Sequence, residues 1–177
     1  MTLDLSIITL GDYEVMIREG LLLDADQKRI EERVGCSWDY NLWSLPLSSL
    51  EELEKGALPA ALQDQIRPSD PVAVALPRLL YVRNFFKALL EMLEKIHLEP
   101  PPEDKALYRR LPAMKGLEGP LLEVRAYFGL TSFDAAAAVP LGDWFLARKD
   151  LYTTAYLERM RMERQKRQKR QIKRLKR

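Results

Sequence analysis

Residues 77–96 read PRLLYVRNFFKALLEMLEKI, the clearest helical pattern in the chain. Apolar residues recur there at steps of three and four, and charged residues occupy positions between them, which is typical of an amphipathic helix packed on a core. The apolar face consists of Leu79, Val82, Phe86, Leu89, Leu90, Leu93 and Ile96. Pro77 suits the first turn of such a helix, and three consecutive prolines from Pro100 end it. We therefore expect this helix to form the centre of the fold.

An N-terminal β-hairpin is predicted from two short apolar segments. Residues 3–9 are apolar and β-branched, residues 13–17 alternate in polarity, and Leu10-Gly11-Asp12 between them has turn chemistry. Because a hairpin is not stable alone in water, it has to pack on the helices that follow. The first of these is expected over residues 25–34, capped by Asp24 and ended by Gly35.

The next stretch contains only short elements. Residues 36–47, CSWDYNLWSLPL, fit a third strand or an ordered loop equally well. Ser48 and Ser49 each precede an acid by three residues, which predicts a capped helix to about Lys55. The segment RPSDP at residues 67–71 is a break before the central helix.

A long C-terminal helix is predicted from Leu141 onward. It follows a short helix between Pro120 and Gly129 and an alanine-rich turn opened by Thr131. Apolar residues give its first four turns a side that can dock on the body, namely Trp144, Phe145, Leu151, Tyr152, Ala155 and Tyr156. We expect the remainder to project into solvent, and disorder beyond about Glu163 is the alternative.

The charge of the chain is divided between a body and a tail. Residues 158–177, ERMRMERQKRQKRQIKRLKR, contain eleven Lys/Arg and two Glu, so residues 1–157 keep seventeen bases and twenty-four acids. A block of like charge is typical of an interaction tail. We therefore predict a compact domain over residues 1–157 and a basic helical arm over residues 158–177. The predicted partner-binding residues are Arg159, Arg161, Arg164, Lys166, Arg167, Lys169, Arg170, Lys173, Arg174, Lys176 and Arg177.

Composition limits the class of protein. A hydrophobic content of 47% in 177 residues is enough for the core of one domain. The single cysteine, Cys36, excludes an internal disulfide and a cysteine-based zinc cluster. The first residues lack the pattern of a signal peptide, and no uncharged stretch is long enough to cross a bilayer. We expect an intracellular, cytoplasmic protein.

Catalytic chemistry is not indicated. His97 is the only histidine, and at the end of the central helix its charge is expected to favour the helix C-terminus rather than to act as a catalytic base. Cys36 is expected to be a buried or half-buried structural residue. Nucleotide-binding, metalloprotease and calcium-loop motifs do not occur. We predict a protein that is not an enzyme and has no cofactor and no metal site.

The basic arm fits several partners. Its bases can neutralise phosphates of RNA or DNA in a salt-sensitive way, or an acidic protein surface. It contains no Trp, Tyr or Phe, so reading of bases is not indicated. A solvated end, or one that folds back on the acidic body, is the plainer interpretation. Membrane insertion is not expected, because Ile172 and Leu175 alone bury too little.

Aromatic residues form a second group of candidates. Trp38, Tyr40, Trp43 and Trp144 are expected to pack in the core, with a role in partner binding as the alternative. A protein partner on the helical body is therefore also open.

Three segments resemble the small tail assembly chaperones of long-tailed bacteriophages. They are LSIITLGDYEVMIRE, LDADQKRIEERVG and VPLGDWFLARKDLY, and the resemblance covers residues 3–35 and 139–152. It implies a protein that holds an aggregation-prone tail component during virion assembly, without catalysis.

The predicted fold is α+β and mainly helical, with a small N-terminal β-hairpin packed on a helical body and a long basic C-terminal helix. The predicted function is that of a non-enzymatic binding or assembly protein whose arm engages an acidic surface. The alternatives are a phage tail assembly chaperone and a sequence-nonspecific RNA/DNA-binding accessory factor.

Overall fold

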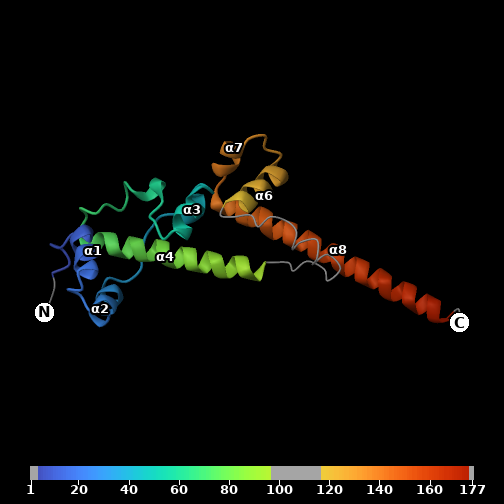
Figure 1. The fold of residues 1–177 in the computed structure, drawn as a ribbon, viewed down its shortest axis with the longest axis horizontal. Helices are drawn as coiled ribbons and strands as arrows, with labels where there is room; N and C mark the ends of the chain where they lie inside the picture. The colour runs from blue at the N-terminus through green and yellow to red at the C-terminus, as the bar shows by residue number, and fades with distance from the viewer. Residues whose placement is uncertain (1–3, 97–116, 176–177) are drawn as a thin grey trace.

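The computed structural model describes residues 4–96 and 117–175, with side chains to residue 169. The described chain is mainly helical (Figure 1). Its helices are α1 (Leu10–Arg18), α2 (Asp24–Val34), α3 (Ser49–Glu54), α4 (Val72–Lys95), α6 (Glu118–Phe128), α7 (Phe133–Ala137) and α8 (Leu141–Leu175), with the 3-10 turns η1 (Leu42–Ser44) and η2 (Ala60–Leu62). None of these helices is long and apolar enough to span a bilayer.

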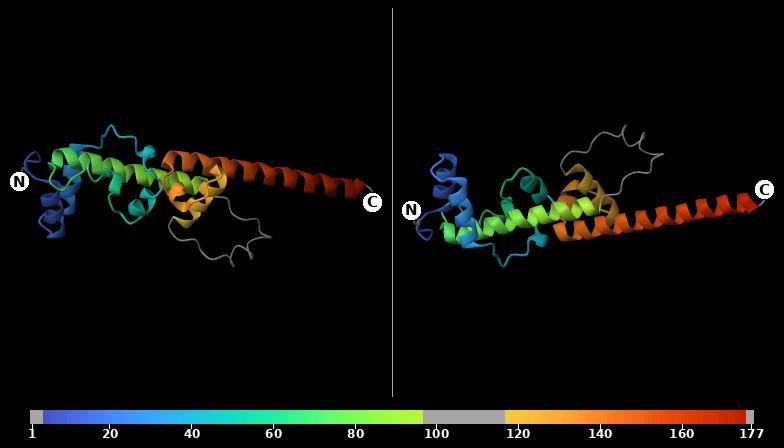
Figure 2. Two further views of the ribbon diagram at one scale, coloured as in Figure 1. Left: turned by 90° about the horizontal axis from the view of Figure 1, so that it is seen from above. Right: turned by 90° about the horizontal axis from the view of Figure 1, so that it is seen from below.

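The helices are arranged along two rods. α1 and α2 pack on the first part of α4, while α6 and α7 gather at the base of α8. Figure 2 shows α8 continuing well past α6, so that its C-terminal half extends beyond the rest of the described chain. The long C-terminal helix is therefore observed, and it runs beyond Glu163 without a break.

The predicted N-terminal hairpin is wrong, since the described part of the chain contains no β-strand. The residues read as its turn begin helix α1, because Thr9 and Asp12 form a capping box. The Asp12 amide donates to Thr9 Oγ1 at 3.2 Å, and the Thr9 hydroxyl donates to Asp12 Oδ2 at 2.6 Å. The Asp12 carboxylate accepts this bond from the hydroxyl and another from the Thr9 amide at 3.3 Å, and both lower the pKa of Asp12. The fold of the described residues is thus helical rather than α+β.

A short antiparallel contact, clasp 1, fixes where α1 and α4 begin. Residues 8–10 and 70–72 exchange two backbone hydrogen bonds of 2.8 and 2.9 Å around the bridged pair Thr9 and Pro71. α1 then starts at Leu10 and α4 at Val72, and both side chains are buried. The clasp therefore supplies hydrogen-bond acceptors for the first backbone amides of two helices, and the first side chain of each helix packs in the core.

A second contact, clasp 2, repeats this arrangement for α8. Residues 45–47 and 139–141 exchange two hydrogen bonds of 2.8 Å around the bridged pair Pro46 and Pro140. Leu47 and Leu141 are buried, and α8 starts at Leu141. α3 begins two residues after Leu47, at Ser49.

Both clasps use the same four-residue motif. Leu-Gly-Asp-Tyr occupies residues 10–13, and Leu-Gly-Asp-Trp occupies residues 141–144. A Cβ on Gly11 would lie 3.3 Å from the Pro68 carbonyl oxygen, and one on Gly142 would lie 3.3 Å from the Trp43 Cβ. Pro68 lies three residues before Pro71 of clasp 1, and Trp43 lies three residues before Pro46 of clasp 2. The residue that each glycine approaches is therefore at the same position relative to its bridged pair. The glycine permits the close approach, and the aromatic residue of each motif is buried.

The central helix is confirmed, with a different start and a shifted face. α4 begins at Val72, so Pro77 lies inside the helix instead of in its first turn. Of the predicted apolar face, Val82 and Leu89 are buried and Leu90 is exposed. Half-buried positions are Leu79, Phe86, Leu93 and Ile96. The predicted stop at residues 100–102 lies outside the described residues.

Local predictions elsewhere differ mainly at helix starts. α2 ends at Gly35 as predicted, but its N-cap is Leu23, which makes no side-chain hydrogen bond, instead of Asp24. Residues 36–47 form an ordered loop with one 3-10 turn, not a third strand. α6 ends at Gly129 in the left-handed conformation, and the N-cap of α7 is Ser132, one residue beyond the predicted Thr131.

Candidate partner-binding arm on helix α8

The first turns of α8 are anchored in the body. Leu141, Trp144 and Ala147 are buried, and Trp144 is only 1% exposed. Glu123 of α6 accepts hydrogen bonds from Trp144 Nε1 at 3.2 Å and from Arg148 Nη1 at 2.8 and 2.9 Å. One carboxylate therefore fixes two side chains of α8 that are one turn apart.

Aromatic packing ties the same turns to two other elements. Trp43 of η1 lies between Phe85 of α4, at a ring separation of 5.0 Å, and Phe145 of α8, at 5.4 Å. At the end of α6, the Tyr127 hydroxyl donates to Asp150 Oδ2 at 3.0 Å. That hydrogen bond to a carboxylate raises the pKa of Tyr127. The base of α8 is thus held from several sides.

Beyond these turns most of the described side chains of α8 are exposed. Side chains from Arg161 to residue 169 are all exposed. Arg159 is half-buried and forms an ion pair with Glu163 at 3.9 Å. The exposed predicted binding residues with described side chains are Arg161, Arg164, Lys166, Arg167 and Lys169. Arg170, Lys173 and Arg174 belong to the helix without described side chains, while Lys176 and Arg177 lie outside the described residues.

The bases surround the arm instead of forming one narrow stripe. Successive residues of an α-helix are about 100° apart, so a step of three drifts by about 60°. Arg161, Arg164 and Arg167 follow this step. An extended acidic surface can therefore contact the arm from more than one direction.

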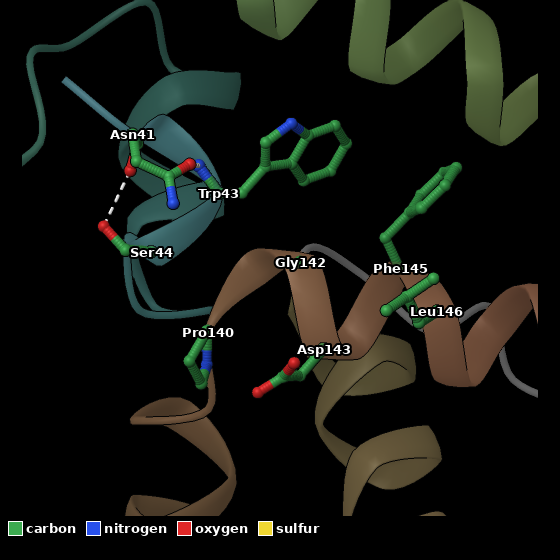
Figure 3. A pocket seen from close by; sticks show the side chains of 8 residues that line it. All are labelled: Asn41, Trp43, Ser44, Pro140, Gly142, Asp143, Phe145 and Leu146. Carbon is green, nitrogen blue, oxygen red and sulfur yellow. Dashed lines mark hydrogen bonds between the residues drawn. The ribbon is translucent and has the colours of Figure 1, made fainter. Parts of the chain in front are cut away.

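A hollow of about 500 Å³ lies beside the start of α8 (Figure 3). The rings of Trp43 and Phe145 form one part of its wall, and the Asp143 carboxylate lies on another side. Its lining residues are Asn41, Trp43, Ser44, Pro140, Gly142, Asp143, Phe145 and Leu146. Asp143 is the only ionisable group among them, so the hollow offers no acid–base pair.

The residues considered for catalysis or metal binding do not form a site within the described part of the chain. His97 lies outside the described residues. Cys36 is exposed rather than buried or half-buried, and the Asn84 amide donates to its Sγ at 3.4 Å. In the part of the chain that the structure describes, no three His, Cys, Asp or Glu residues are placed to hold a metal ion.

The predicted aromatic group is divided between core and surface. Trp144 is in the core, as expected, whereas Trp38, Tyr40 and Trp43 are half-buried. Trp38 stacks on Tyr40 at a ring separation of 4.9 Å, and the Arg78 guanidinium lies 5.9 Å from the Trp38 ring.

A set of exposed apolar residues on α8 was missed as a candidate binding surface. The sequence assigned Leu151 and Tyr156 to the docked side, yet they are 42% and 45% exposed. Met160 and Met162, which lie among the bases, are exposed as well. The apolar pattern of the first four turns was visible in the sequence, but the body buries only the beginning of it.

No protein-family model, curated protein or solved structure matches this chain.

Proposed function

We propose that the protein is a non-enzymatic binding or assembly factor whose C-terminal arm engages an acidic surface. The helical body acts as the scaffold, and the distal half of α8 is the binding element. The acidic surface is either the phosphate backbone of a nucleic acid or an acidic face of a protein.

The continuity of α8 carries this proposal. One helix of 35 residues is buried at its start, at Leu141 and Trp144, and is exposed along residues 161–169, which hold five of the tail's eleven bases. A solvated tail would need no such anchor. A charged rod held by a folded body presents its charges in fixed positions, which steers an oppositely charged partner toward it.

The arm also suits sequence-independent contact. Without Trp, Tyr or Phe in residues 158–177, it has no group that stacks on bases. Neutralisation of phosphates or carboxylates by Lys and Arg would dominate binding, so the affinity should fall as salt rises.

A chaperone for a viral tail component is a second candidate. It is supported by the exposed apolar residues on α6 and α7, among them Leu122, Phe128 and Phe133. Such side chains can cover an aggregation-prone segment of a client. The resemblance to tail assembly chaperones stays a prediction.

A salt titration tests the proposed function. Fluorescence anisotropy of labelled polyglutamate and of a short double-stranded RNA would be measured with the full chain and with a variant that carries Gln at positions Arg164, Lys166, Arg167 and Lys169. We expect salt-sensitive binding of at least one probe, and a shallower salt dependence for the variant.

The matched control neutralises four exposed bases of the body instead. Gln replaces Lys28, Arg33, Lys87 and Lys95 in this variant, which removes the same charge. If both variants lose affinity equally, net charge and not the arm is responsible. Absence of salt-sensitive binding to both probes would reject the function.

A further inference from the structure

We infer that α8 docks an acidic amphipathic helix of a partner protein through an apolar stripe formed by Leu151, Tyr152, Ala155 and Met162. This inference rests on the proposed function and names the class of partner.

The stripe continues the face of α8 that is buried in the body. Trp144, Leu151, Ala155 and Met162 follow one another at steps of seven, four and seven residues, so they lie on one side of the helix. Trp144 is buried, whereas Leu151 and Met162 are 42% and 58% exposed. The body thus covers this face only at its start.

Tyr152 widens the stripe on one side. Its ring is nearly parallel to that of Tyr156, one turn further along the helix, and the ring centroids are 6.4 Å apart. Residues 151–162 extend over about 17 Å, at a rise of about 1.5 Å per residue. An apolar strip of about three turns matches the apolar face of one partner helix.

The charge of the same face specifies the occupant. Glu158 and Arg159 flank the stripe on opposite sides before Met162. Beyond Met162, steps of four and three residues reach Lys166 and Lys169, so the face ends in basic residues. A second copy of this helix in parallel would bring the two basic arms together, which is unfavourable. A helix with an apolar side and acidic flanks satisfies both parts.

Nucleic acid is a poorer occupant of the stripe. Phosphates would contact the lysines, but Leu151 and Met162 gain free energy only by burial against other apolar groups. The stripe would then stay in water. A protein partner uses both features of the face, since burial supplies affinity and charge supplies steering.

The probe for this inference is a synthetic helix with Leu at heptad positions a and d and Glu at e and g. Its companion has the same composition in scrambled order, so that Leu is spread around the helix. Binding of both labelled peptides to the full chain is measured by anisotropy. We expect the patterned peptide to bind at least about tenfold more tightly.

Matched variants locate the binding face. Leu151→Gln with Met162→Gln removes apolar groups from the stripe without changing charge. Leu146→Gln with Leu157→Gln removes two residues that are 62% and 49% exposed. Leu157 lies about 120° around the helix from Leu151. The stripe variant should lose about tenfold in affinity for the patterned peptide, and the other variant should match the wild type.

Several results would overturn the inference. Equal affinity for the patterned and scrambled peptides, or an equal loss of affinity in the stripe variant and the control variant, would mean that charge alone drives binding. RNA binding without binding of either peptide would assign the arm to nucleic acid. A dimer that disappears in the stripe variant would identify a second copy as the occupant. In the first two cases salt-sensitive binding persists, so the proposed function survives. The proposed function itself fails only if the full chain binds none of the polyanionic probes.

Discussion

Replacement of Trp144 by alanine should destabilise the protein by about 4 kcal/mol. The side chain is 1% exposed, and truncation of a buried Trp costs about 3–5 kcal/mol because it leaves a cavity. Loss of the hydrogen bond from Nε1 to Glu123 is included in this range, at about 1 kcal/mol. The Glu123 carboxylate keeps its bonds to Arg148, so no buried charge is left without a partner.

Urea unfolding followed by far-UV circular dichroism measures this change. A variant with Trp144→Phe keeps most of the apolar surface and should lose about 1–2 kcal/mol, which guards against complete unfolding of the alanine variant. Leu146→Ala, on the exposed side of the same helix, should stay within about 0.5 kcal/mol of the wild type. If Trp144→Ala costs no more than Leu146→Ala, α8 is not anchored through Trp144.

Further predictions concern the second clasp, one ion pair and the cysteine. Gly142→Val should cost about 1–3 kcal/mol and lower the melting temperature, because even a Cβ would lie 3.3 Å from the Trp43 Cβ; an unchanged melting temperature would contradict the close approach. Burial raises the pKa of Glu31, but hydrogen bonds from Arg83 and Gln27 outweigh it and hold the pKa below its ordinary value of 4.5. This contribution to stability is therefore present above pH 4.5 and lost as the pH falls below it, and Glu31→Gln should flatten the acid limb of a stability–pH profile. The thiol of Cys36 is exposed and should react with a thiol reagent in the native protein as fast as in urea, and strong protection would contradict its exposure.

One motif shows why the N-terminal part was predicted wrongly. Leu-Gly-Asp followed by an aromatic residue begins both α1 and α8, but Gly11-Asp12 was read as a hairpin turn and Gly142-Asp143 as the start of a helix. Turn chemistry and helix N-caps use the same residue types, so a short window does not separate them. Comparison of the two copies within the chain would have favoured the helix.

Other differences arise from contacts distant in the sequence. The start of α4 at Val72 depends on backbone bonds to residues 8–10, which no local pattern reveals. By contrast, the long helix from Leu141 was predictable, because nothing after Gly142 interrupts it. The basic arm follows from charge alone. The exposed stripe could not be predicted in this way, because tertiary packing against α6 decides how much of α8 is buried.

The most direct measurement is a pull-down from lysate of the full chain beside the variant with Gln at Arg164, Lys166, Arg167 and Lys169, with and without nuclease and at low and moderate salt. An acidic partner should be recovered with the full chain, in smaller amount with the variant, and in smaller amount as the salt concentration rises. Recovery of the same partner by both proteins, independent of salt, would contradict a function for the basic arm.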